Sequence, residues 1–340
     1  MSVGLDIGSK TIKTVEIVKE SENKFILKAA GIVGYSGKDM ESIRDENESE
    51  FVGLIDAIKK LFKSAKISSK DVAVALPESQ VFTRPVKFPM LTDQEVGAAV
   101  KWEAEQYIPI PVKEAVIQYQ VLERREDSVP PEVLVLLVAS PRALVEKYVK
   151  VLNMAGLNPV AVETELMSLV RSLAPLDQTV LLVDFGARST DLAIAKNGAL
   201  AFSRSIQTAG EAFTRAVAQS LSITPKQAEE YKRTYGLSGS QLEAKVRSAI
   251  DPVFRVIVDE IKKAIHFYQT EEKGDPPTSV ILSGGTSGLP EAVSYLTKLL
   301  GIEVIIGNPF LKINVDADTL KNLSSYAPLY SIASGLALRD

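Results

Sequence analysis

Residues 5–13 have the sequence Leu-Asp-Ile-Gly-Ser-Lys-Thr-Ile-Lys, and residues 183–191 have the sequence Val-Asp-Phe-Gly-Ala-Arg-Ser-Thr-Asp. In both stretches a strand pattern ends in an acidic residue, a turn with glycine and small hydroxyl residues follows, and a second strand pattern begins. The stretches form an internal repeat in motif, although the two halves of the chain share little other similarity. This repeat predicts two related β-hairpins, one at the start of each half.

The first hairpin combines the chemical features of a phosphate site. Glycine and small residues in a turn let backbone N–H groups point at an anion, and the carboxylate of Asp6 at the strand end could hold Mg²⁺ through water. Strand alternation places Thr11, Lys13, Val15 and Ile17 on one face. A lysine on this apolar face needs an anionic partner, and a phosphate would serve. The alternative is a plain hairpin with a surface lysine.

The second hairpin offers the same elements around Asp184 and Gly186. Taken alone, it could be an ordinary β-turn. Two such turns at the starts of two halves favour hairpins that face each other across a cleft. In that arrangement both turns would grip phosphates, and the carboxylates of Asp6 and Asp184 would share one metal ion.

Two further segments could complete such a site. A buried strand pattern enters Gly284-Gly285, whose backbone can approach a phosphate or a flat ring closely; the alternative is a tight strand-to-helix turn. A helix predicted over 225–235 begins with a possible capping box at Thr224 and carries Glu229 and Lys232 on one face. These two side chains could contact adenine and ribose, or they could form an ordinary ion pair on a solvated face.

Composition limits the other functions of the chain. Its 340 residues suggest about two domains, and a net charge of −4 indicates no general attraction to nucleic acid or an anionic membrane. It has no cysteine and one histidine, His266, so disulfides and thiolate metal sites are excluded. The N-terminus lacks the pattern of a signal peptide, and no apolar run is long enough to span a membrane. We therefore expect a cytoplasmic protein without direct membrane insertion.

Hydrophobic periodicity and turn residues predict the elements in outline. The segment 38–50, rich in Asp and Glu, is expected to be a solvated loop, and Ser140 is expected to be the N-cap of a helix that ends before Gly156. Residues 80–155 form a β-α-β-β-α pattern that can fold as a small subdomain. The expected strands cover 3–7, 12–18, 25–34, 72–76, 80–88, 115–123, 132–139, 158–163, 180–185, 191–195, 199–205 and 280–282. The expected helices cover 50–65, 93–107, 164–174, 210–222, 225–235, 241–248, 251–271, 290–300 and 328–338.

The motifs, taken in order, resemble those of the actin-like ATPase superfamily over essentially the whole chain. They are DIGSKTIK (6–13), VETELMSL (162–169), VDFGARSTDL (183–192), AEEYK (228–232), LSGGTSGLP (282–290) and YSIASGLALR (330–339). The segments WEAEQYIPIP (102–111) and IQYQVL (117–122) are similar to the PilM family of type IV pilus assembly proteins, which is itself similar to the FtsA cell-division proteins.

This resemblance implies an α/β, actin-like (ribonuclease H-like, duplicated) two-domain fold with an inserted subdomain of the FtsA/PilM type. Subdomain 1A would comprise 1–79, 156–176 and 327–340, and the inserted subdomain 1C would comprise 80–155. Subdomain 2A would comprise 177–209 and 277–326, and subdomain 2B would comprise 210–276.

The resemblance also implies ATP and Mg²⁺ as cofactors and gives individual residues their roles. Asp6 and Asp184 would approach Mg²⁺ through water, and Glu163 would orient the attacking water. The first hairpin would contact phosphates through Gly8, Ser9, Lys10 and Lys13, and the second would present Gly186, Ala187 and Arg188. Ribose and base would face Gly210, Glu211, Glu229 and Lys232. The adenosine would be covered by Gly284, Gly285, Thr286 and Ser287.

Two departures from the superfamily pattern favour binding over hydrolysis. Active relatives often have Asp-x-Gly-Gly-Gly-Thr in the second hairpin, whereas this chain has Ala187 and Arg188 in place of the later glycines. A Cβ at each position narrows the approach of the backbone to the γ-phosphate, and Arg188 could compensate as a charge partner. Ala209-Gly210 stands where Gly-Gly is common. ATP binding with at most weak ATPase activity is expected.

The implied function is a nucleotide-binding scaffold of a type IV pilus or related secretion system. The implied partner is the cytoplasmic N-terminal peptide of a PilN-like inner-membrane protein, which would recruit the chain to the inner membrane. Pilus motor ATPases are a further candidate partner, and nucleic acid is not one. The peptide groove is expected between the inserted subdomain and the first domain, near 81–88 and 93–107. The apolar residues there could equally be subdomain core.

Two other functions are open to this superfold. A cell-division membrane tether of the FtsA type would need an amphipathic helix after a linker, and none is expected beyond Leu338-Arg339-Asp340. A small-molecule kinase or phosphatase would need a general base aimed at a substrate hydroxyl, and no candidate aspartate in a suitable extra domain is evident.

Overall fold

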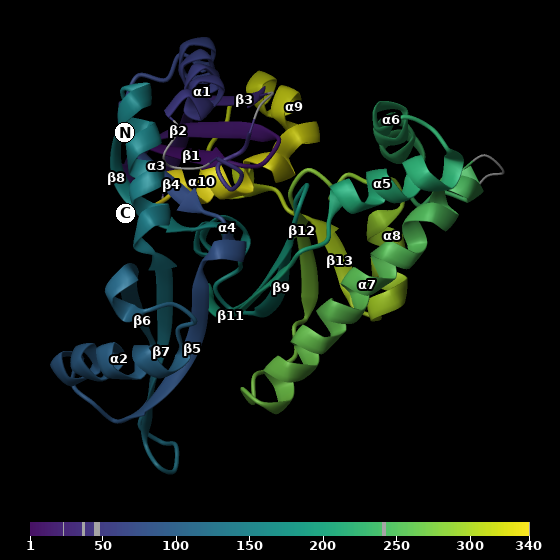
Figure 1. Cartoon of the computed structure of the whole chain (residues 1–340). Helices are drawn as coiled ribbons and strands as arrows, with labels where there is room; N and C mark the ends of the chain where they lie inside the picture. Colours follow the sequence, from purple (N-terminus) through teal and green to yellow (C-terminus); the bar gives the residue numbers. More distant parts are fainter. Residues whose placement is uncertain (23, 36–37, 44–47, 240–242, 340) are drawn as a thin grey trace.

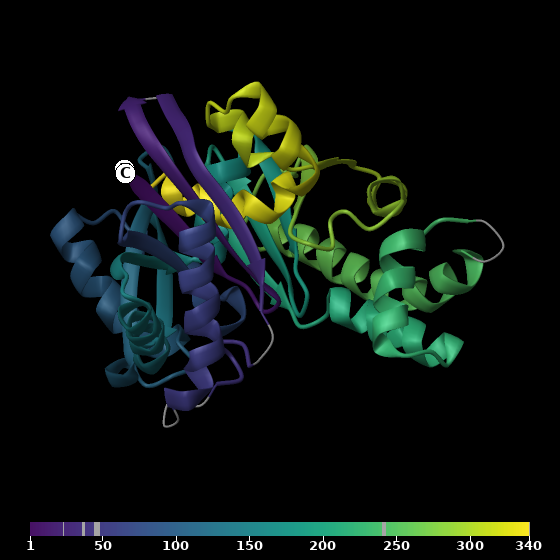
Figure 2. The same ribbon diagram turned by 90° about the horizontal axis from the view of Figure 1, so that it is seen from above.

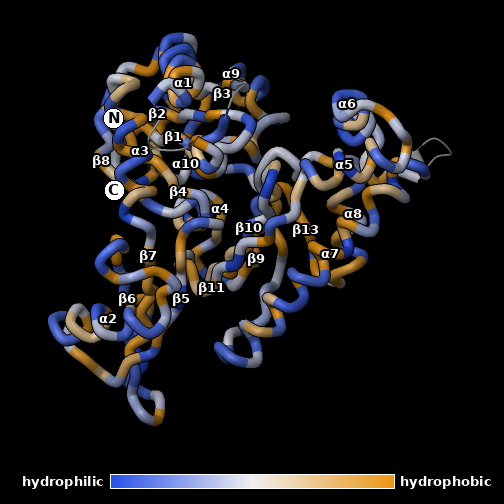
Figure 3. Tube along the Cα trace, in the orientation of Figure 1, coloured by the Kyte–Doolittle hydropathy of each residue, from blue (hydrophilic) through white to orange (hydrophobic). Residues whose placement is uncertain are grey.

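The computed structural model describes residues 1–339 except 23, 36–37, 44–47 and 240–242. Two lobes and a smaller unit are visible in Figure 1 and, from above, in Figure 2. Each lobe is built on a five-stranded sheet, and the smaller unit is built on a three-stranded one. In Figure 3, hydrophobic residues run along the central strands of the second lobe, whereas α6 is largely hydrophilic.

The first sheet has the strand order β3-β2-β1-β4-β8. Strands β1 (Ser2–Ile7), β2 (Thr11–Ser21) and β3 (Lys24–Gly34) form an antiparallel meander, and β4 (Asp71–Leu76) and β8 (Asn158–Thr164) continue it in parallel. Helices α1 (Val52–Ala65) and α3 (Arg142–Ala155) bury their apolar stripes against one face. Helices α4 (Glu165–Leu173) and α10 (Ser331–Ala337) lie on the other face.

The second sheet repeats this topology with the order β11-β10-β9-β12-β13. Its meander consists of β9 (Thr179–Phe185), β10 (Thr190–Lys196) and β11 (Ala199–Ile206), followed in parallel by β12 (Ser279–Ser283) and β13 (Glu303–Ile306). One face packs on α4 and α10, so these two helices fill the space between the sheets. The other face is covered by α5 (Gly210–Leu221), α7 (Glu243–Thr270) and α8 (Ala292–Leu300), with α6 (Pro225–Tyr235) beside them. The two related hairpins predicted from the repeat and the duplicated fold implied by the resemblance are thus confirmed.

The smaller unit has the strand order β5-β7-β6, from β5 (Phe82–Pro89), β6 (Ala115–Arg125) and β7 (Glu132–Pro141), with α2 (Asp93–Tyr107) packed on it. A capping box formed by Thr92 and Glu95 begins α2. Helix α3 follows β7, but its buried residues join the core of the first lobe. The subdomain boundaries stay a prediction. The remaining short elements are α9 (Ala317–Leu323) and 3₁₀ turns at Glu48–Phe51, Glu78–Gln80, Val112–Glu114, Pro309–Lys312 and Ser324–Tyr330.

Two local predictions were wrong, and two short elements were missed. Helix α7 runs unbroken through Pro252, although a proline in a helix removes one backbone hydrogen bond. The buried stripe that includes Val246, Ile250 and Phe254 offsets this loss. Helix α3 begins at Arg142 with Pro141 as its cap, so the hydroxyl of Ser140 does not cap it. The strand β13 and the helix α9 were not predicted, because both are short and depend on neighbouring elements.

The segment 38–50 also differs from the solvated loop that its composition suggests. Asp39, Met40 and Ile43 are buried, and Met40 and Ile43 belong to the core of the first lobe. Two well-spaced apolar side chains are enough to anchor this acidic stretch on the protein. Residues 44–47 lie outside the described part of the chain.

Candidate functional site

A single cleft of about 1350 Å³ separates the two lobes. It is lined by the turns of both hairpins, by the start of α5, by one face of α6 and by the segment after β12. Every residue predicted to bind the cofactor lines it: Asp6, Gly8, Ser9, Lys10, Lys13, Asp184, Gly186, Ala187, Arg188, Gly210, Glu211, Glu229, Lys232, Gly284, Gly285, Thr286 and Ser287. Four segments that are far apart in sequence therefore meet at one crevice.

The first hairpin sets Lys13 directly opposite Asp6. The two residues are partners in the β1–β2 ladder, and the Nζ atom of Lys13 lies 2.9 Å from Oδ2 of Asp6. A Cβ on Gly8 would be 3.1 Å from that Nζ atom, so the ammonium lies beneath the turn. Burial lowers the pKa of Lys13, but the charges of Asp6, Asp184 and Glu165 outweigh it, and the pKa is raised. Lys13 is therefore a permanent cation at the base of the cleft.

The second hairpin has a closely similar turn. The N–H group of Gly186 donates to the carbonyl of Ser189 at 3.1 Å, as that of Gly8 does to Thr11 in the first hairpin at the same distance. A Cβ on Gly186 would be 2.8 Å from the Ser189 carbonyl oxygen, so the turn needs a glycine there. Asp184 is the last residue but one of β9 and lines the cleft. Its neighbour across the ladder, Asp191, lines the cleft as well.

Glycines also permit the close approach of the third segment. Gly284 has φ of +83°, and a Cβ there would be 2.6 Å from the Phe185 carbonyl oxygen and 2.7 Å from Oδ1 of Asp184. The hydroxyl of Thr286 donates to the carbonyl of Gly186 at 2.8 Å. A Cβ on Gly210 would be 2.5 Å from this hydroxyl oxygen. The predicted adenosine and phosphate segments are thus packed backbone to backbone.

On α6, the ion-pair interpretation of Glu229 and Lys232 holds in part, and their contact with adenine and ribose stays a prediction. Their ion pair is present at 2.6 Å. The pair is not on a solvated face, however, because Lys232 is buried and also donates to the carbonyl of Gly210 at 3.2 Å and to the hydroxyl of Thr214 at 3.1 Å. The α6 face is therefore locked to the start of α5 at the cleft wall.

The structure does not bring Glu163 to the cleft. Its carboxylate accepts two hydrogen bonds from Arg171, at 2.6 and 2.8 Å, and it is absent from the cleft lining. The carboxylate that does line the cleft on this element is Glu165, at the first position of α4. The N–H group of Glu78 donates to it at 3.2 Å. The change from strand to helix explains the difference in position, since Glu163 is still in β8 and Glu165 is the first residue of α4.

Sequence reasoning missed Glu165 and Asp191, although both stand in quoted motifs. Burial raises the pKa of Glu165 well above its usual range, and the charges of Asp191, Asp6 and Asp184 add to the shift. Burial raises the pKa of Asp191 to about 6. Oδ1 of Asp191 is buried without a hydrogen-bond partner in the described part of the chain. Such an atom costs free energy unless a ligand or water satisfies it.

These residues fit Mg²⁺ held through water and phosphate. Four acidic side chains line the cleft, those of Asp6, Asp184, Glu165 and Asp191. The ammonium of Lys13 is paired with Asp6 and interacts electrostatically with Asp184 and Glu165. Among the described residues, no group of three or more His, Cys, Asp or Glu side chains could hold a metal ion directly. A Mg²⁺ ion normally keeps several waters and takes one or two carboxylates plus phosphate oxygens, which is the arrangement that this cleft allows.

Nucleotide affinity should depend on pH through Asp184. Burial raises the pKa of Asp184 to about 7, and the nearby charge of Asp191 adds to the shift. Below this pH the carboxyl is neutral and must release a proton when a cation binds, so affinity falls as pH falls. We expect Mg·ADP affinity to drop about tenfold from pH 8 to pH 6 by calorimetry. Asp184→Asn should show a weaker pH dependence, which comes from ADP itself and from Asp191 and Glu165. An equal slope in wild-type protein and variant would contradict this prediction.

Comparisons with known proteins identify the family and the fold of the chain. The family model described as "Type IV pilus assembly protein PilM" matches residues 4–340. A solved PilM–PilN type IV pilus biogenesis complex contains a chain that is 29% identical, with a TM-score of 0.84 and coverage of 99% of this chain and 98% of that one. The cell division protein FtsA of Pseudomonas aeruginosa is 25% identical over 99% of this chain and 88% of its own length. MreB5 of Spiroplasma citri bound to AMPPNP shares the fold, with a TM-score of 0.55, 14% identity and coverage of 98% and 93%.

Proposed function

The chain belongs to the PilM family of type IV pilus assembly proteins, and on this premise we propose that it is an ATP-binding scaffold of the pilus inner-membrane assembly complex. One observation carries the nucleotide part of the proposal. Two hairpin turns with matching backbone hydrogen bonds, each with an aspartate near the end of its first strand, line one cleft together with Lys13. The phosphates of ATP would be held by Lys13 and the backbone of the turns, and Mg²⁺ would lie between the phosphates and the acidic side chains.

We propose that the chain binds ATP and hydrolyses it at most slowly. Glycines at positions 187 and 188 would let the backbone of the turn lie closer to the γ-phosphate. The Cβ of Ala187 and the side chain of Arg188 keep the backbone farther away. Arg188 is already paired with acidic residues of the first lobe. Glu165 lines the cleft, and burial together with the charges of Asp191, Asp6 and Asp184 raises its pKa well above the usual range. A raised pKa favours the neutral carboxyl, which is a poor base.

The proposed partner is the cytoplasmic N-terminal peptide of a PilN-like inner-membrane protein. The similar solved chain is part of a PilM–PilN complex, and none of the described helices combines the length and hydrophobicity that a membrane crossing requires. Such a partner would hold a cytoplasmic chain at the inner membrane. Pilus motor ATPases stay a further predicted partner.

The proposed peptide groove lies where β5 leaves the first lobe. Val81 packs on the core of that lobe, whereas Val86 and Phe88 belong to the core of the small unit. These apolar residues are therefore core, as the alternative interpretation has it. The exposed surface that a peptide could contact includes Arg84, which stacks on the ring of Tyr107 at 4.5 Å on α2.

Calorimetry with a synthetic PilN N-terminal peptide tests this part of the proposal. We expect a dissociation constant of roughly 1–100 µM, because a short peptide buries less area than a standard protein interface. Arg84→Glu should weaken binding about tenfold, whereas Lys298→Glu on the exposed face of α8 should have no effect. The absence of binding to the wild-type protein, with a scrambled peptide giving the same trace, would rule the partner out.

A further inference from the structure

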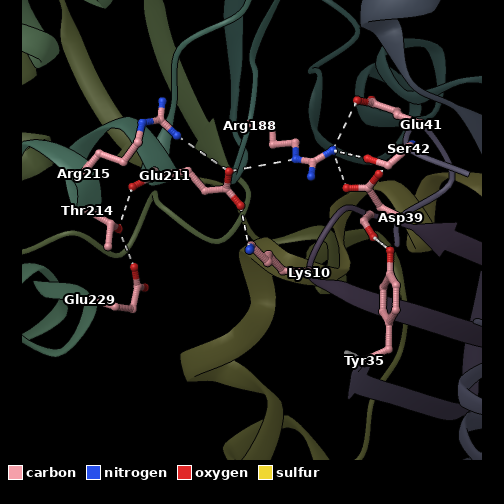
Figure 4. Close-up of polar contacts among 12 residues, drawn as sticks. Lys10, Tyr35, Asp39, Glu41, Ser42, Arg188, Glu211, Thr214, Arg215 and Glu229 are labelled. Atoms are coloured by element: carbon pink, nitrogen blue, oxygen red, sulfur yellow. Dashed lines mark hydrogen bonds and ion pairs between the residues drawn. The ribbon is translucent and has the colours of Figure 1, made fainter. Parts of the chain in front are cut away.

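Arg188 joins the two lobes through an ion network at the mouth of the cleft (Figure 4). Its guanidinium pairs with Asp39, and its Nη1 atom lies 3.8 Å from Oε2 of Glu41 and 3.4 Å from the hydroxyl of Ser42. Its Nε atom lies 3.9 Å from Glu211. Arg188 belongs to the second hairpin, whereas Asp39 belongs to the first lobe.

Several contacts fix Asp39 in its position beside Arg188. It is buried, and its Oδ1 atom accepts from the N–H group of Ser42 at 2.9 Å, which leaves Oδ2 for Arg188. Its carbonyl accepts from the N–H groups of Ser42 and Ile43 at 3.0 and 3.1 Å. Met40 and Ile43 seat the segment in the core of the first lobe. A buried carboxylate that loses its cationic partner is strongly disfavoured, so the segment 38–43 depends on Arg188 for its placement.

Arg188 is also the guanidinium that lines the cleft from the turn of the second hairpin, where a terminal phosphate would lie if the proposed function holds. Planar guanidinium groups bind phosphate and carboxylate with the same forked geometry. Asp39 and a terminal phosphate would therefore compete for the guanidinium of Arg188. Lys10, in the first hairpin, is similarly paired with Glu211 at 2.6 Å across the cleft.

We propose that Asp39 is an internal substitute for the terminal phosphate at Arg188, and that it makes the cleft distinguish nucleoside triphosphates from diphosphates. A triphosphate displaces Asp39 and releases the segment 38–43, whereas a diphosphate leaves the ion pair intact. This inference rests on the proposed nucleotide site and adds a specificity determinant to it. Release of the segment 38–43 also couples the bound nucleotide to the small unit. Lys147 of α3 donates to the carbonyl of Ile43, and α3 continues directly from β7 of that unit.

Affinities for Mg·AMP-PNP and Mg·ADP test the competition. Asp39→Asn removes the competing charge, so we expect AMP-PNP to bind about tenfold more tightly while ADP affinity changes less than about twofold. Arg188→Gln should weaken AMP-PNP binding about tenfold, and adding Asp39→Asn to it should have no further effect, because the coupling requires both residues. Asp56→Asn, an exposed aspartate of α1 in the same lobe, is the matched control and should match the wild-type protein.

Hydrogen exchange at the amides of Ser42 and Ile43 provides a second measurement. Exchange should be faster with AMP-PNP than with ADP, and Arg188→Gln should reach the faster rate without nucleotide. If ADP binds but Asp39→Asn changes both affinities equally, or if nucleotide leaves exchange unchanged, the inference is overturned while the nucleotide site stands. If the wild-type protein binds neither nucleotide, the proposed site itself fails and the competition with it.

Discussion

Replacing Lys13 with methionine is expected to lower the affinity for Mg·ATP about 100-fold or more. The ammonium lies 2.9 Å from Asp6 and interacts electrostatically with Asp184 and Glu165. Without it, the phosphates would meet these acidic groups with no buried cation beside them and would also lose a charge-assisted hydrogen bond. About 2.7 kcal/mol of lost interaction corresponds to this factor. Methionine has a similar length and an apolar stem, so the packing against the hairpin face is retained.

The control for this experiment is Lys10→Met. Lys10 is largely exposed and pairs with Glu211 at the mouth of the cleft, and exposed ion pairs contribute little. We expect a change of only a few-fold in affinity. Calorimetry measures the binding, and circular dichroism verifies that Lys13→Met is folded. If it is not, Asp6→Asn combined with Lys13→Met removes both partners of the buried pair and should restore folding without restoring binding. Affinity within threefold of wild type for folded Lys13→Met would refute the assigned role.

Replacing Gly335 with alanine is expected to destabilise the protein by about 3–5 kcal/mol. A Cβ there would lie 1.8 Å from the carbonyl oxygen of Ser168 and 2.5 Å from its carbonyl carbon, so α10 and α4 would have to separate. These two helices fill the space between the sheets, and few side chains can rearrange to relieve the clash. The carbonyl of Gly335 also accepts a hydrogen bond from Arg171 at 2.7 Å.

Thermal unfolding followed by circular dichroism measures this effect. A loss of this size should lower Tm by roughly 10 °C. Gly288→Ala is the matched control, because a Cβ at Gly288 has no heavy atom within 4 Å, and its Tm should remain within about 1 °C of the wild-type value. Equal melting of Gly335→Ala and the control would show that the interface between α4 and α10 yields more easily than its geometry indicates.

The sequence alone determined the two hairpins through local rules, whereas its resemblance to the actin-like superfamily predicted the duplicated halves and most members of the cleft. Alternation in a strand fixed the face of Lys13. Glycine at a turn or strand end marked Gly186 and Gly284, where the structure leaves no space for a Cβ. An Asn-Gly pair is typical of a tight hairpin turn, and Asn197 and Gly198, which join β10 to β11, both have positive φ.

Only the tertiary structure decided which of these groups meet and what each is paired with. Glu163 is held by Arg171, while Glu165 faces the cleft. Arg188 is held by Asp39 in a segment whose composition suggests a solvated loop, and α7 continues through Pro252 because its buried stripe outweighs one missing hydrogen bond. The partners of Glu163 and Arg188 are 8 and 149 residues away along the chain. Periodicity and turn residues report the conformation of a segment and the face of a side chain. They carry no information on contacts between distant segments, which the packing of the two lobes creates.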